Sequence, residues 1–175
     1  MIEEKEIINR VMNSSIVTID LEDYYHKGER VEYDIAQHLF QGLMLREKDF
    51  RAYVKDNDWS VYHNKNIALF CSEDAIVPTW AYMLLATRLQ PYANKVVHGR
   101  AEVLEYALFK DSLSEIDLDE LKNRPVVVKG CGDLPVPESA FVEITMLLQP
   151  VVRSIMYGEA CSSVPLWKQS RVVKG

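Results

Sequence analysis

The sequence predicts an α/β fold: a mainly parallel sheet of about four strands flanked by helices, in a single domain spanning residues 1–175. Short continuous apolar runs at 67–70 and 126–128 are typical of strands covered on both faces. Each run is followed by a turn and then a helical apolar pattern, at 79–90 and from 138 onward. Strands that alternate with helices favour parallel pairing.

The remaining pattern supplies the other elements in order. Helices are expected at 3–12, 34–45, 47–55 and 102–109, and strands at 15–19 and 95–97. The last helix is expected to be long, with Pro150 bending it and Val151, Val152 and Ile155 continuing its apolar face.

An internal repeat supports two similar strand–turn–helix units. Residues 74–91 match residues 133–150 at seven of 18 positions, with a constant offset of 59. The shared prolines, Pro78 and Pro137, suit the first position of a helix. Asp74 and Asp133 stand just before, where a carboxylate can accept orphan N–H groups, so for these two aspartates taken alone, twin capped turns without any ligand are the favoured interpretation. We expect the two units to lie at the same edge of one sheet.

Charge and hydropathy exclude two classes of partner. The chain has 20 basic and 26 acidic residues, for a net charge of −6, and no long basic stripe, so nucleic acid is not expected as a partner. The most apolar run, 75–86, is too short to span a membrane and contains a proline. We expect a cytoplasmic protein whose three cysteines are thiols.

The turn after the second apolar strand is the strongest candidate site. Gly130 and Gly132 flank Cys131 and permit close approach by a ligand, and Asp133 follows them. We predict a ligand site formed by these four residues with Asp74. A cysteine between a strand end and a helix start is a candidate thiolate, although a buried, inert thiol is the alternative.

Two further groups could supply metal ligands. Cys131 and Cys161 would make half of a zinc or iron–sulfur site, provided that the chain between them bends at Gln149-Pro150 or returns along the helix. Asp20, Glu22, Asp23 and His26 crowd one segment, for which an acidic solvated loop is the alternative.

Several of these stretches resemble one known family. Residues 18–25, 39–42, 47–51, 75–90, 129–137 and 154–165 are similar to the bacterial domain-of-unknown-function family 2480. The resemblance covers nearly the whole chain. It implies a small cytoplasmic bacterial protein and an iron–sulfur assembly context, but no catalytic residues.

Three functions remain open at this point. The leading hypothesis is a thiol-dependent accessory factor that handles a metal or sulfur, with Cys131 as the first ligand or nucleophile and Cys161 as the second. A non-enzymatic protein–protein adaptor, using Trp80, Tyr82 and Trp167, is the alternative, with a protein partner or a homodimer. The third is a small-anion-binding domain at the two helix N-termini. The sequence assigns no reaction.

Overall fold

The computed structural model describes residues 16–130, 132–159 and 161–170. Contacts divide the chain into two compact units: the inserted unit, residues 26–109, and the terminal unit, residues 1–25 with 110–175. The single domain over residues 1–175 stays a prediction, because a division by contacts does not show whether either unit folds alone.

The terminal unit contains a four-stranded sheet in the order β1-β7-β8-β9. Its strands are β1 (Val17–Asp20), β7 (Pro125–Lys129), β8 (Ser154–Tyr157) and β9 (Val164–Lys168). The first three are parallel, and β9 is antiparallel to β8. Helix α4 (Glu138–Leu148) connects β7 to β8. The predicted fold class, a mainly parallel sheet of about four strands flanked by helices, is therefore confirmed.

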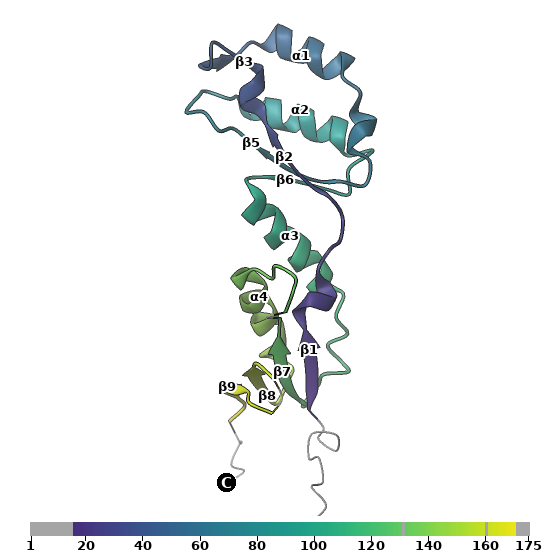
Figure 1. Cartoon of the computed structure of the whole chain (residues 1–175), viewed down its shortest axis with the longest axis vertical. Helices are drawn as coiled ribbons and strands as arrows, with labels where there is room; N and C mark the ends of the chain where they lie inside the picture. The colour runs from purple at the N-terminus through teal and green to yellow at the C-terminus, as the bar shows by residue number, and fades with distance from the viewer. Residues whose placement is uncertain (1–15, 131, 160, 171–175) are drawn as a thin grey trace, which may run out of the picture. The chain divides into compact units, whose positions relative to one another are not determined.

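The inserted unit has a parallel sheet in the order β2-β5-β6 and a small hairpin. Its strands are β2 (Arg30–Asp34), β5 (Asn66–Phe70), β6 (Lys95–His98) and the hairpin pair β3 (Leu39–Phe40) and β4 (Met44–Leu45). Its helices are α1 (Glu47–Asp56), α2 (Thr79–Leu89) and the first part of α3 (Ala101–Ser114). Within this unit, α1 and α2 are stacked over one face of the sheet, and α3 begins on the other (Figure 1).

Strand β5 is buried on both faces because helices cover both. Ile67 and Leu69 belong to the core that contains Phe50 of α1 and Leu85 of α2. Ala68, which points the opposite way, packs with the α3 residues Leu104 and Leu108. The continuous apolar run in the sequence thus marks a central strand, as expected for a parallel sheet.

The internal repeat is a structural duplication. Each of β5, α2 and β6 has a counterpart exactly 59 positions later, in β7, α4 and β8. The buried faces correspond as well: Ala81, Leu85 and Leu89 of α2 match Ala140, Ile144 and Leu148 of α4. Asn64 and Asn123, each just before the first strand, both have a φ of 58°. The two similar strand–turn–helix units are confirmed.

The duplication also includes the strand that begins each sheet. Asp20 ends β1 and caps the 3-10 helix η1 (Leu21–Tyr24), and Asp34 ends β2 and caps η2 (Ile35–His38). In each unit this strand pairs with the first strand of the repeat.

Several expectations are wrong. The two repeats lie in separate sheets, not at one edge of the same sheet.

Residues 34–45 form the end of β2, η2 and a hairpin instead of a helix, because Asp34 caps a single turn and Gln41 and Gly42 have positive φ. The last helix ends at Leu148, and the apolar residues beyond it belong to β8 and the turn before it. The helix expected at 3–12 lies outside the described residues.

Candidate functional site

A pocket of about 340 Å³ lies where the three parallel strands of the terminal unit end. Asp20 ends β1, Lys129 ends β7, and Gly158 and Glu159 follow β8. Glu22 of η1 and the loop residues Gly130, Gly132 and Asp133 complete the lining. Open α/β sheets bind their ligands outside this edge, because the loops after parallel strands converge there.

Lys129 links the carboxylates around the pocket. Its Nζ lies 2.9 Å from Oδ2 of Asp20 and 3.9 Å from Oε1 of Glu159. The hydrogen bond with Asp20 raises the pKa of Lys129 and lowers the pKa of Asp20. Asp20 also accepts a hydrogen bond from the Glu22 N–H at 3.1 Å, which favours its ionised form further. Both side chains are therefore charged at neutral pH.

Gly132 lies directly against the side chain of Glu22. Its backbone N–H donates to the Glu22 carboxylate, and a Cβ added at this position would overlap that carboxylate. At Gly130 an added Cβ would lie 3.0 Å from Cβ of Leu21 and 3.2 Å from Cζ of Phe141. The glycines let the loop after β7 approach η1, which holds Glu22 at the pocket.

The lining of the pocket is acidic. Asp20, Glu22, Asp133 and Glu159 contribute four carboxylates, and Lys129 contributes one cation. This balance favours a cationic ligand and opposes a small anion, so the charge of the pocket argues against the anion hypothesis.

Comparison with known proteins identifies the family. The family model described as "Protein of unknown function (DUF2480)" matches residues 5–169. The chain belongs to the DUF2480 family. No curated protein and no solved structure matches it.

This DUF2480 chain brings together three of the predicted ligand residues: Gly130, Gly132 and Asp133 line the pocket. Cys131 lies outside the described residues. Cys161 is exposed and follows Glu159 by two positions. Within the described residues, no group of three or more His, Cys, Asp and Glu side chains is arranged to hold a metal. The zinc or iron–sulfur site at Cys131 and Cys161 therefore stays a prediction.

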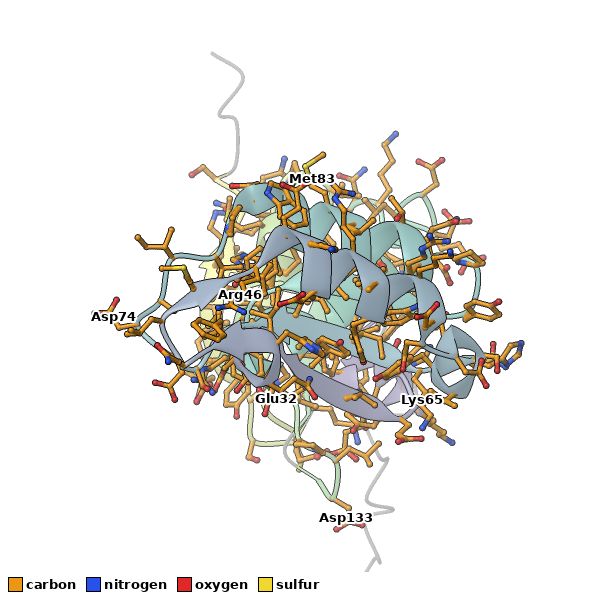
Figure 2. All side chains as sticks on the ribbon, turned by 90° about the horizontal axis from the view of Figure 1, so that it is seen from above. Glu32, Arg46, Lys65, Asp74, Met83 and Asp133 are labelled. Atoms are coloured by element: carbon orange, nitrogen blue, oxygen red, sulfur yellow. The ribbon has the colours of Figure 1, made fainter. Side chains whose placement is uncertain are left out.

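Asp74, the fifth predicted ligand residue, belongs to the inserted unit. It lies at the tip of the loop between β5 and α2 and points into solvent (Figure 2). Neither Asp74 nor Asp133 provides a side-chain cap, since α2 and α4 have Pro78 and Pro137 at their N-caps and no side-chain hydrogen bond there.

The corresponding edge of the inserted unit has different chemistry. Asp34 accepts hydrogen bonds from the N–H groups of Ala36 at 2.9 Å and Ser72 at 3.0 Å. Burial opposes its ionisation, but these bonds and the charge of Arg100 outweigh burial and lower the pKa of Asp34. Arg100 also stacks on the ring of Phe70 at 4.3 Å. Phe70 and Arg100 occupy the positions of Lys129 and Glu159, so the charges at this edge differ from those of the acidic pocket.

The sequence indicated part of this site. Asp20 and Glu22 belong to the acidic segment that the sequence indicates as a source of metal ligands, and both line the pocket. His26, from the same segment, instead contacts Asn66 and Asn94 in the inserted unit. Sequence reasoning missed Lys129 and Glu159 as site residues. The 59-residue offset could have indicated them: it aligns them with Phe70 and Arg100, which stand at or just after the ends of two predicted strands.

No helix among the described residues is long and apolar enough to cross a membrane.

Proposed function

We propose that this chain is a thiol-dependent accessory protein that binds a thiophilic metal, as zinc or in an iron–sulfur cluster, at the acidic pocket of the terminal unit. Cys131 and Cys161 are the proposed thiolate ligands, and Asp133 or a water completes the coordination. A cytoplasmic location is part of the proposal, because a reducing compartment keeps the thiols available.

One observation carries the proposal. Strand β8 runs parallel to β7, so the chain returns from the end of α4 to the edge where β7 ends. Gly158 and Glu159, just before Cys161, consequently line the same pocket as Gly130 and Gly132, which flank Cys131. A site shared by Cys131 and Cys161 requires the chain to return along α4, and β8 provides that return.

The charges of the pocket support a cation. The carboxylates of Asp20, Glu22, Asp133 and Glu159 offset the charge of an incoming metal, and Lys129 can stabilise thiolates once they form. Cys71 has no such surroundings: its thiol donates to the carbonyl of Glu73 at 3.4 Å in the inserted unit.

Metal analysis of the full chain, purified without a histidine tag, tests the proposal. We expect zinc or iron to be retained by the unaltered protein and lost in Cys131→Ser and in Cys161→Ser. Cys71→Ser is the matched control and should retain the metal. Equal metal content in all four proteins, or none in the unaltered one after growth in zinc- and iron-supplemented medium, would overturn the proposal.

The adaptor is the second candidate. It is favoured by an apolar pocket of about 390 Å³ between α2 and β6, to which Tyr82 contributes. Trp80 is less suited, because it is half-buried against Phe50 and Arg51 stacks over its ring.

A further inference from the structure

The two duplicated sheets differ at one edge. In the terminal unit, β8 has neighbours on both sides, β7 and β9. In the inserted unit, β6 ends the order β2-β5-β6, and no strand formed by the described residues pairs with its other side. An open strand edge is a template for pairing with another segment.

The surfaces beside these two edges correspond closely. Val96 pairs with Ile67 in one unit, and Ile155 pairs with Val126 in the other, each 59 positions later. The aromatic contact between helix and strand is repeated too: the ring centroids of Tyr82 and His98 are 4.6 Å apart. Those of Phe141 and Tyr157, their counterparts, are 5.7 Å apart. The position of β9 beside β8 therefore shows where an additional strand would pair with β6.

The pairing of β9 with β8 indicates where the side chains of a strand added beside β6 would lie. Trp167 lies opposite Ile155, and directly opposed residues in an antiparallel pair share a face of the sheet. The corresponding place in the inserted unit is beside Val96, which packs toward the core containing α2. The apolar pocket between α2 and β6 is located there, lined by Val96, Tyr82, Met83 and Ala86 among others.

Met83 of α2 is among the residues that line this pocket. This side chain is 65% exposed on α2, and it points outward from the helix (Figure 2). Val142, its counterpart on α4, is 64% exposed although β9 is present, so the apolar pocket that Met83 lines with Tyr82 and Val96, and not its exposure, carries the argument.

We propose that β6 accepts an extended segment of a partner protein as an antiparallel strand, with a bulky apolar side chain opposite Val96 in this pocket. Backbone hydrogen bonds would supply affinity and the pocket would supply specificity. Lys95 occupies the position of Ser154, which lies opposite Lys168 of β9. The partner segment therefore carries no basic residue opposite Lys95, directly after the apolar one, because like charges directly opposite each other destabilise a strand pair.

A peptide of residues 163–170 with Lys168→Glu is the probe, added to the full ¹⁵N-labelled chain and followed by NMR. We expect saturable shifts at Val96 and Val97, with a Kd below about 1 mM. Trp167→Ala in the peptide should weaken binding by about tenfold or more, as should Met83→Asp in the protein. Val142→Asp, at the counterpart position on α4, is the matched control and should leave binding unchanged.

Three results would overturn the proposal. One is the absence of saturable shifts at β6. Another is a set of shifts confined to β8, which would show that the peptide replaces β9 in the terminal unit. The third is self-association of the chain through β6 that the peptide does not compete with, which would make a second copy the occupant.

Discussion

Lys129 and Asp20 form an ion pair at 2.9 Å across the ends of β7 and β1. They are far apart in the sequence, and the parallel pairing of their strands places them opposite each other, with Asp20 in register with Lys129. The ion pair stabilises the ionised form of Asp20, which is one of the four carboxylates that line the pocket.

Acid should weaken the terminal unit through Asp20. The pKa of Asp20 lies below its ordinary value of 3.8 in the folded protein, so the folded state binds fewer protons than the unfolded state in this range. Its contribution to stability is complete above pH 3.8 and is lost as the pH falls through the lowered pKa. Asp20→Asn should lower the melting temperature at pH 6 and reduce its fall below pH 4, as measured by calorimetry. An unchanged acid slope would contradict the assignment.

His38 should make the inserted unit sensitive to mild acid. Burial lowers its pKa from the ordinary value of 6.5, and its Nε2 is 2.8 Å from the hydroxyl of Tyr33. The unfolded state therefore binds the proton more readily, and stability contributed by neutral His38 falls as the pH drops below 6.5. Hydrogen exchange in β2 and α1 should accelerate between pH 7 and 5 beyond the intrinsic trend. His38→Gln should remove that excess, whereas His63→Gln should retain it.

Gly132 and Glu22 should behave as one energetic unit. Gly132→Ala places a methyl group against the Glu22 carboxylate and forces it away from the Gly132 N–H. Glu22→Ala removes the same hydrogen bond, so the double variant should be about as stable as either single variant, not additively worse. Denaturant unfolding of the four proteins completes the cycle. Additive losses would show that the two residues do not interact.

Core substitutions should show whether the chain is one cooperative domain. Leu85→Ala and Ile144→Ala remove side chains at duplicated, fully buried positions and should each cost about 2–5 kcal/mol. Helix α3 runs across the division between the units, so we expect each variant to lower the midpoint of a single unfolding transition. Hydrogen exchange that accelerates only in the unit carrying the substitution would show two domains instead.

The sequence alone determined the parallel α/β class, the helices 47–55 and 79–90 to within one residue, and the duplication. It also indicated the start of the helix expected at 102–109, which extends to Ser114. These features are local: a continuous apolar run or a helical period appears in the residues themselves. The duplication was visible because residues 74–91 and 133–150 retain both the turn prolines and the buried helix positions.

Short strands were harder to predict than the central ones. The apolar residues of 34–45 fit a helical period, but the capping of Asp34 and the positive φ of Gln41 and Gly42 produce a turn and a hairpin. Val151, Val152 and Ile155 fit the continued face of the last helix, but Ile155 lies in the strand β8. A run of four residues cannot distinguish a strand from a helix.

Only the tertiary structure decided which residues share a site. The pocket requires β1 to pair with β7 and β8 to return beside it, and these pairings join segments separated by most of the chain. Backbone hydrogen bonds between strands carry no signature in a single sequence, because every residue type offers the same N–H and C=O groups, proline's missing N–H excepted. Register and long-range packing therefore placed Asp20 and Glu159 around Lys129, and Asp74 in a different unit from Asp133.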